Sequence, residues 1–344
     1  AALKAMTQAL AHRGPDDGAV VLLGPERGDV TGGRDEHERR PPGPGAAILG
    51  LGHRRLKVID LSGAAAQPMR GAGGDGWLVY NGELYNAEEL RRELRGRGVR
   101  FRSRSDTEVV LESLAAWGPE ALPRFNGMFA LAFWQPNEHR LILARDRFGE
   151  KPLYYMRAGG LLVFASEIGA LVRHGGPPLS VDPEAVELYL SFGFIPAPWT
   201  IYREVRKLPH ASYLEARSRR EPRLSRYYRL EDRLRGPAPA RPEEAVREAL
   251  QAAVSRRLEA DVPLGAFLSG GLDSTAVVAF MCRARAAPPR TYSMSVPGLG
   301  YFDEAPGSRK TAALLGTLHR EVPVDAARLQ AEIPFVLDRL AEPF

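Results

Sequence analysis

Short apolar runs alternate with polar residues through the first two hundred positions and predict many strands with few helices. Strands are expected at residues 18–23, 46–51, 77–80, 129–134, 140–145 and 161–166. Helices are expected at residues 3–12 and 86–95, and a third begins at Asp106. The Asn81-Gly82 dipeptide predicts a turn directly after the strand at 77–80. This mixture indicates an α+β domain.

After residue 241 the pattern changes to helices that alternate with strands. Pro242, Glu243 and Glu244 suit the first turn of a helix, because proline is tolerated there and acids face the positive end of the dipole. A strand at 264–268, a helix at 275–285, a strand at 291–296 and a helix at 303–315 follow. The alternation predicts a parallel sheet with crossover helices. We therefore expect domains at residues 1–216 and 242–344, joined by a charged linker at 217–241.

The junction between the strand at 264–268 and the helix after it reads Ser269-Gly270-Gly271-Leu272-Asp273-Ser274. Glycines let the backbone approach a ligand, and free N–H groups at a helix N-terminus attract negative charge. No Gly-Lys-Ser/Thr follows, so this is not a Walker loop. It resembles the pyrophosphate loop of enzymes that split ATP between its α and β phosphates. A plain glycine-rich turn is the alternative, but it would require two glycines, an acid and two serines to coincide here.

Composition places limits on cellular context and partners. The chain has 344 residues, of which 44% are hydrophobic and 26% charged, which is ordinary for a globular protein of two domains. No apolar run approaches the ~18 residues of a membrane span, and a cytoplasmic location without a membrane partner is expected. The net charge is +5, but the arginines are scattered, so no nucleic-acid partner is expected. The single cysteine, Cys282, excludes an internal disulfide and predicts a buried structural thiol.

Nine short motifs follow one another in the N-terminal part of the chain. They occupy residues 12–18, 52–56, 59–62, 67–69, 80–86, 105–108, 126–130, 144–149 and 151–155. In this order they resemble the glutaminase domain of the glutamine-hydrolysing asparagine synthetases, which are class II glutamine amidotransferases. The Ser269 loop and Tyr301-Phe302-Asp303-Glu304 resemble the synthetase domain of that family. The resemblance implies an N-terminal-nucleophile hydrolase sandwich (αββα), followed by an α/β parallel-sheet PP-loop ATPase domain.

Side-chain chemistry and the resemblance agree on a site for free glutamine. Arg55 can hold a carboxylate by two parallel hydrogen bonds, and Asp106 can hold an ammonium group. Asn81 and the N–H of Gly82 can form an oxyanion hole. The resemblance gives these residues the same roles and adds Glu83 as a glutamine contact. Taken singly, Asn81-Gly82 is usually a hairpin turn, Arg55 an ion-pair residue and Asp106 a helix cap.

The resemblance also implies a ligase that converts aspartate to asparagine through β-aspartyl-AMP, with ammonia from glutamine. ATP and Mg²⁺ are the expected cofactors, with Asp273 as a metal ligand. The expected pyrophosphate contacts are Ser269, Gly270, Gly271, Asp273 and Ser274. Phe267 and Met294 are expected to line the adenine pocket, near the ends of adjacent strands.

Two departures from the family bear on activity. The family's nucleophile is an N-terminal cysteine, whereas this chain begins Ala1-Ala2-Leu3-Lys4, and Cys282 lies in the other domain. The family also continues beyond the Glu342-Pro343-Phe344 end. We therefore expect a fragment that is inactive by itself. The role of an insertion at 24–45 stays open, and so does the oligomeric state, with a homodimer as one alternative.

Other functions remain open. The parent protein could be a related amidotransferase that acts on a peptide or a polysaccharide precursor. A non-enzymatic sensor could bind glutamine through Arg55, Asn81 and Asp106 without hydrolysis. A GMP-synthetase-like function is disfavoured, because that family's glutaminase is a Cys-His-Glu type and the N-terminal half here holds no cysteine.

Overall fold

The computed structural model describes residues 1–24, 30–31, 48–74, 76–217, 220–234, 236–297, 303–337 and 339–343. Most of the insertion at 24–45, and also Tyr301 and Phe302, lie outside the described residues. The chain divides into unit 1, Ala1–Arg233 with Leu340–Phe344, and unit 2, Leu234–Arg339. Within the described part of the chain, no helix has the length and apolar character needed to cross a membrane.

The described residues of unit 1 form three antiparallel sheets. The first is ordered β2 (Val30–Thr31), β1 (Asp17–Leu23) and β3 (Leu49–Arg55). The second is ordered β10 (Val205–Lys207), β8 (Tyr154–Ala158) and β9 (Leu161–Ala165). The third is ordered β12 (Arg223–Arg226), β11 (Ser212–Arg217), β7 (Arg140–Arg145), β6 (Gly127–Gln135), β5 (Trp77–Leu84) and β4 (Met69–Arg70). Its helices are α1 (Ala2–Ala9), α2 (Ala87–Gly96), α3 (Asp106–Trp117), α4 (Ile168–Val172) and α5 (Pro183–Phe192).

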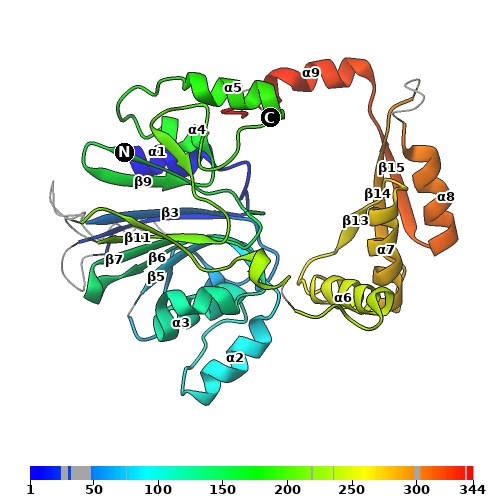
Figure 1. The fold of residues 1–344 in the computed structure, drawn as a ribbon, viewed down its shortest axis with the longest axis horizontal. Coiled ribbons are helices and arrows are strands. Elements are labelled where there is room, and N and C mark those ends of the chain that lie inside the picture. Colours follow the sequence, from blue (N-terminus) through cyan, green and yellow to red (C-terminus); the bar gives the residue numbers. More distant parts are fainter. Residues whose placement is uncertain are drawn as a thin grey trace. The chain divides into compact units, whose positions relative to one another are not determined.

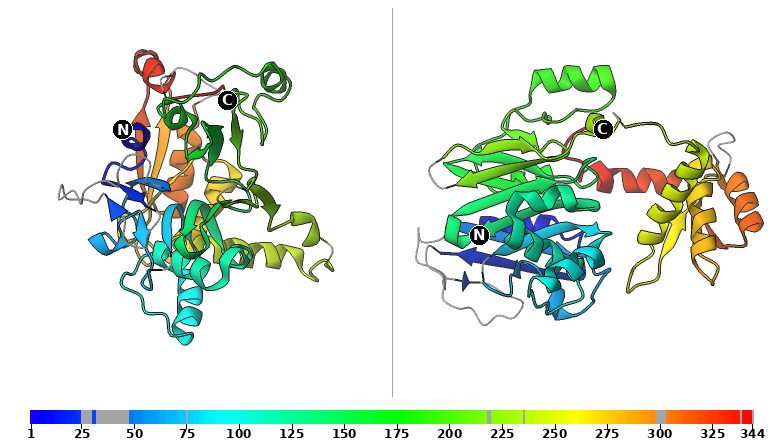
Figure 2. Two further views of the ribbon diagram at one scale, coloured as in Figure 1. Left: turned by 90° about the vertical axis from the view of Figure 1, so that its left-hand side faces the viewer. Right: turned by 60° about the horizontal axis from the view of Figure 1, so that its bottom comes forward.

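These elements stack in four layers, with α2 and α3 on one side of the sheets and α1 and α4 on the other (Figures 1 and 2). Leu111 and Leu114 of α3 are buried against the six-stranded sheet. Leu51 of β3 packs on Val79 of β5 between the sheets, and Met6 of α1 packs among the buried residues of β8, β9 and α4. Each sheet is therefore apolar on both faces, and the predicted αββα sandwich is confirmed.

The predicted turn at Asn81-Gly82 is wrong. Strand β5 runs without interruption from Trp77 to Leu84, and Asn81 and Gly82 pair with Ala130 and Phe129 of β6. A Cβ atom at Gly82 would lie 2.2 Å from the carbonyl oxygen of Met128. The glycine is therefore required for close strand pairing and not for a turn.

The segment predicted as a linker is partly regular structure. Residues Arg223–Arg226 form β12, which pairs with β11 at the edge of the six-stranded sheet. The buried residues of β11 hold this segment in unit 1. Tyr227 also holds it, because it packs against the apolar core between α3 and the six-stranded sheet.

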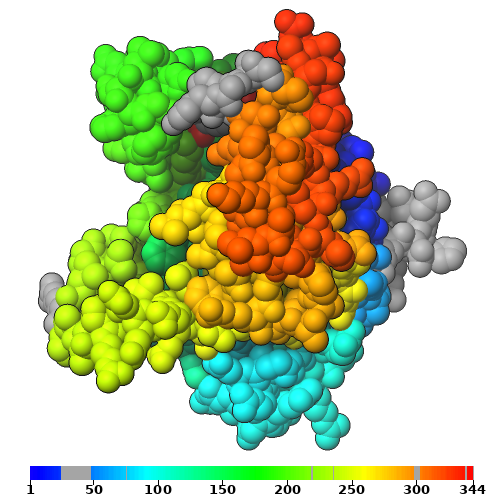
Figure 3. Space-filling model, turned by 90° about the vertical axis from the view of Figure 1, so that its right-hand side faces the viewer, coloured from blue at the N-terminus to red at the C-terminus, as the bar shows by residue number. Residues whose placement is uncertain are grey.

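Unit 2 is a parallel sheet with helices, which confirms the predicted α/β class. Its sheet is ordered β13 (Gly265–Phe267), β14 (Arg290–Ser295) and β15 (Leu318–Pro323), all parallel. Its helices are α6 (Pro242–Arg256), α7 (Leu272–Ala284), α8 (Ala305–Leu315) and α9 (Ala326–Leu337). Val278 of α7 and Ala312 of α8 pack on Leu268. The helix α8 is orange in Figure 3, and its Leu314 is exposed.

Candidate functional site

A cavity of about 640 Å³ in unit 1 brings together all five residues predicted to bind glutamine or to form the oxyanion hole. They are Arg55, Asn81, Gly82, Glu83 and Asp106. Strand alternation explains the convergence. Arg55 shares a strand face with the inter-sheet residue Leu51, and Asn81 shares one with Val79, so both side chains enter the layer between the sheets.

Arg55 is 6% exposed, and its guanidinium holds the turn that follows β3. One terminal nitrogen, Nη2, donates to the carbonyl oxygens of Ile59 at 3.1 Å and Asp60 at 2.6 Å. The other, Nη1, donates to that of Ser62 at 3.3 Å. Because a guanidinium carries five N–H donors, these contacts fix its orientation and are compatible with a ligand carboxylate as a further partner.

Asp106 is the first residue of α3 and is 7% exposed. Its carboxylate accepts from the backbone N–H of Leu84 at 2.9 Å and from that of Thr107 at 2.8 Å. Burial raises the pKa of Asp106 to about 6, and the nearby charge of Glu83 adds to the rise, although the backbone hydrogen bonds oppose it. The N-cap of α3 is Ser105, so Asp106 is available for a charged ligand.

The backbone before Asn81 is held by two residues to which the sequence assigned no role. The side-chain amide of Gln67 accepts from the N–H of Tyr80 at 2.6 Å and donates to its carbonyl at 3.1 Å, as a neighbouring strand would. Nε2 of His53 lies 3.1 Å from the same carbonyl, so it is the protonated nitrogen. Burial lowers the pKa of His53 to about 4, and Arg55 adds to the fall.

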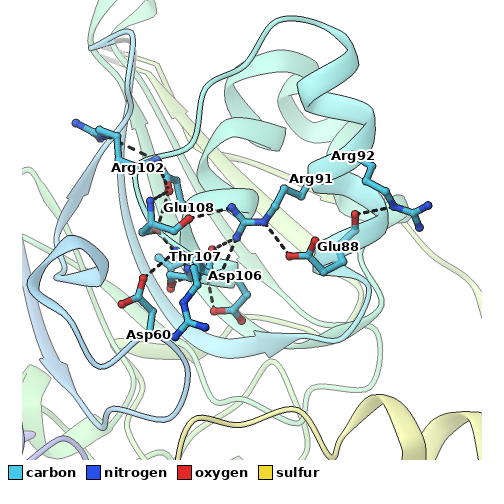
Figure 4. Close-up of polar contacts among 11 residues, drawn as sticks. Asp60, Glu88, Arg91, Arg92, Arg102, Asp106, Thr107 and Glu108 are labelled. Atoms are coloured by element: carbon cyan, nitrogen blue, oxygen red, sulfur yellow. Dashed lines mark hydrogen bonds and ion pairs between the residues drawn. The ribbon is translucent and has the colours of Figure 1, made fainter.

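A polar network fixes the segment in front of Asp106 (Figure 4). The guanidinium of Arg91, only 3% exposed, donates to the carbonyl oxygens of Ser103, Arg104 and Ser105 at 2.9–3.0 Å. The carboxylate of Glu108 accepts from the N–H groups of Arg102 and Ser103. Arg91 also pairs with Glu88 through Nε at 3.0 Å, and Glu108 also accepts from the hydroxyl of Ser103 at 2.6 Å. These bonds to backbone and side chains hold the segment before α3 in a fixed conformation.

The Ser269 loop of unit 2 lies between β13 and α7, as predicted. Gly270 has a φ of +79°, and Gly271 is the N-cap of α7. The hydroxyl groups of Ser269 and Ser274 are 2.9 Å apart. A Cβ atom at Gly270 would lie 2.8 Å from the backbone nitrogen of Ser308, so the loop also packs against the first turn of α8. Two helix N-termini therefore flank a glycine loop, and that arrangement fits a phosphate group.

Phe267 and Met294 lie on one face of adjacent strands and are 88% and 58% exposed. They face away from Leu268 and the helices, and they form an open apolar surface beside the loop. Asp273 is exposed in the first turn of α7. Among the described residues no three His, Cys, Asp or Glu side chains cluster as a metal site, so a Mg²⁺ ion at Asp273 would need phosphate oxygens as further ligands.

Cys282 packs between α7 and α8 in unit 2, where its thiol lies 3.6 Å from the carbonyl oxygen of Leu315. Burial raises the pKa of this thiol. A raised thiol pKa and apolar neighbours are typical of a structural cysteine, as predicted, although Cys282 is partly and not fully buried.

Comparison with known proteins finds similarity in both units. The profile described as "Glutamine amidotransferase domain" matches residues 45–228, and the profile "Asparagine synthase" matches residues 245–344. "Asparagine synthetase [glutamine-hydrolyzing] 1" of Bacillus subtilis is 33% identical over 99% of this chain and 50% of its own length. "Asparagine synthetase [glutamine-hydrolyzing] 3" of the same organism is 35% identical over 92% and 50%. "Amidase chyE" of Penicillium rubens is 35% identical over 67% and 34%. The chain spans about half the length of the asparagine synthetases that it matches.

Proposed function

We propose that this chain, which belongs to the glutamine amidotransferase domain family, is the glutamine-binding and nucleotide-binding part of a glutamine-hydrolysing asparagine synthetase. The parent enzyme would be a ligase: ATP adenylates the side-chain carboxylate of aspartate, and ammonia from glutamine displaces AMP to give asparagine. A cytoplasmic location and a homodimer remain predictions, and so do the domain limits at 1–216, 217–241 and 242–344.

The observation that carries this proposal is the cavity of unit 1, which holds a buried cation and a buried carboxylate together. Arg55 would bind the α-carboxylate of glutamine and Asp106 its α-ammonium group. Since both side chains are anchored by backbone hydrogen bonds, little conformational entropy is lost on binding. Glu83 also lines the cavity and would contact the same ligand.

Hydrolysis of the glutamine amide needs an oxyanion hole and a nucleophile. Asn81 and the N–H of Gly82 would stabilise the tetrahedral intermediate, in a position fixed by Gln67 and His53. We expect the nucleophile to be a cysteine thiolate on an extended segment that reaches this cavity. Strands β3 and β9 are edge strands of their three-stranded sheets, and residues of both line the cavity. The N–H and C=O groups at these edges could hydrogen-bond to such a segment.

In unit 2 the Ser269 loop would bind the pyrophosphate of ATP. The N–H groups at the start of α7, with the hydroxyl groups of Ser269 and Ser274, supply donors, and Asp273 would hold Mg²⁺ against the phosphates. The metal would neutralise charge that develops on the leaving pyrophosphate. The exposed side chains of Phe267 and Met294 would contact adenine.

Pyrophosphate exchange into ATP tests the nucleotide part of the proposal. In the native protein that contains this chain, exchange should require aspartate, and Asp273→Asn should abolish it while glutaminase activity persists. Glu248→Gln, an exposed charge removal on α6, is the matched control and should leave exchange intact. Unchanged exchange in Asp273→Asn would refute the role of this residue.

One observation favours an ammonia acceptor other than aspartate. The relatives include a protein named as an amidase, which aligns with two thirds of this chain. The glutamine site and the nucleotide loop would serve such an amidotransferase equally well. Exchange that depends on a peptide or a polysaccharide precursor, and not on aspartate, would select this alternative.

A further inference from the structure

Asp60, in the turn that follows β3, is a buried carboxylate outside the proposed ligand contacts. It is 5% exposed, and its φ of +54° lies in the left-handed region, which is uncommon for a residue with a side chain. Such a conformation costs free energy and persists only where surrounding contacts enforce it. The hydrogen bonds of Asp60 show what enforces it.

Three segments meet at this residue. One carboxylate oxygen, Oδ1, accepts from the N–H of Ser62 at 3.1 Å and from its hydroxyl at 2.5 Å. The other, Oδ2, accepts from the N–H of Arg104 at 2.8 Å. The carbonyl oxygen of Asp60 accepts from Arg55 at 2.6 Å. These bonds outweigh the effect of burial and leave the pKa of Asp60 below its usual value, so it is charged at neutral pH.

The hydrogen bond to Arg104 connects Asp60 to the segment that precedes Asp106. Arg104 stands two residues before Asp106, and its carbonyl is held by Arg91 (Figure 4). Asp60 therefore joins the turn that orients Arg55 to the segment that positions Asp106, across 44 residues of sequence. It thus bonds directly to Arg55 and, through the N–H of Arg104, to the segment that leads to Asp106.

We propose that Asp60 is a positioning residue that sets the separation of Arg55 and Asp106, and that the site thereby selects ligands carrying both an α-carboxylate and an α-ammonium group. This inference rests on the proposed glutamine site. The change Asp60→Asn keeps the size of the side chain but places an NH₂ group against one of the N–H donors. The bond from the N–H of Arg104 or the bond from the N–H of Ser62 must then break, which loosens the link between the two sides of the cavity.

A residue that only stabilises the fold would affect all ligands alike, whereas a residue that fixes a separation affects ligands held at both ends. Two analogues separate these roles. 4-Carbamoylbutanoate lacks the ammonium group of glutamine, and 4-aminobutanamide lacks its carboxylate. Each of them can contact only one member of the pair Arg55 and Asp106.

Calorimetric titration of the chain with glutamine and both analogues is the test. Asp60→Asn should weaken glutamine binding about tenfold, the size of one lost charge-assisted hydrogen bond, and change analogue binding less than about twofold. Ser62→Ala, which removes one donor and keeps the Arg104 bond, should show the same selectivity at about threefold. Asp182→Asn is the control, because Asp182 is also buried but caps α5, and it should leave the preference unchanged.

Equal losses for all three ligands in both variants, or no loss for glutamine in Asp60→Asn, would overturn this inference. If the unchanged chain bound glutamine no more tightly than either analogue, that result would count against the glutamine site itself. In that case Asp60 would have no pair to position, and both proposals would fail.

Discussion

Glutamine binding at the Asp106 site is expected to weaken as the pH falls below about 6. The ligand's ammonium group needs the carboxylate form of Asp106, and burial raises the pKa of this residue to about 6. Below that pH each further unit lowers the fraction of carboxylate about tenfold. The affinity at about pH 5 should thus be roughly tenfold lower than at about pH 7, a loss of about 1.4 kcal/mol.

Titration of the neighbouring His53 does not obscure this dependence. His53 lines the same cavity, but burial lowers its pKa to about 4, so it stays neutral over the relevant range. An ammonium ligand favours the charged form of Asp106 and lowers its pKa, so binding near pH 5 should release close to one proton. The raised pKa also means that Asp106 costs the folded state stability above about pH 6, and that this cost disappears below about pH 4.

Calorimetry from about pH 5 to pH 8, in two buffers with different ionisation enthalpies, measures both the affinity and the released protons. The Asp106→Asn variant should bind glutamine weakly, with no pH dependence in this range. A flat affinity in the unchanged chain, or a stronger affinity toward acid, would refute the assignment of Asp106 as the ammonium ligand.

Three further predictions concern folding. Burial of neutral His53 should add up to about 3 kcal/mol to the free energy of unfolding at pH 7, and this is lost as the pH falls from about 6.5 to 4, because over that range only the unfolded chain takes up the proton. In urea unfolding, the free energy of unfolding of His53→Gln should therefore fall less steeply toward acid, and an identical pH dependence would contradict this. Gly82→Ala should destabilise unit 1 by more than about 2 kcal/mol, measured by thermal unfolding, whereas Gly96→Ala, with open space around its Cβ, should be neutral or stabilising; equal effects would refute the close approach of β5 and β6. Leu111→Ala should cost about 2–5 kcal/mol and Leu190→Ala, on the exposed surface of α5, less than about 0.5 kcal/mol, in the same unfolding assay; similar costs would contradict the assigned core.

The apolar pattern predicted an α+β domain of many short strands and few helices, because periodicity reports burial directly. The αββα layers themselves were implied by the family resemblance and not by the periodicity. It failed at Asn81-Gly82, where a local turn preference competes with pairing to β6, a strand that lies more than forty residues away. Register between distant strands is set by the partner's packing, which a local pattern does not contain. The strand at 77–80 was therefore predicted too short by four residues.

The charged residues that would bind the ligand could be predicted from the sequence, but the residues that hold the site in place could not. Arg55 and Asp106 carry chemistry that suits an amino acid, whatever their neighbours. Asp60 and Gln67 act by bonding to backbone atoms of Arg104 and Tyr80, and such contacts leave no periodic or compositional signal. An acid in a short motif after a strand reads as an ordinary turn residue until its partners are seen.

Transfer of labelled nitrogen tests the central claim most directly. The native protein that contains this chain would be incubated with glutamine labelled with ¹⁵N at the side-chain amide, aspartate, ATP and Mg²⁺, and the products read by mass spectrometry. The account predicts ¹⁵N-asparagine, AMP and pyrophosphate in equal amounts, with the label lost from asparagine in an Arg55→Ala variant that still uses free ammonia. Asparagine that carries no label, or ATP cleaved to ADP, would contradict it.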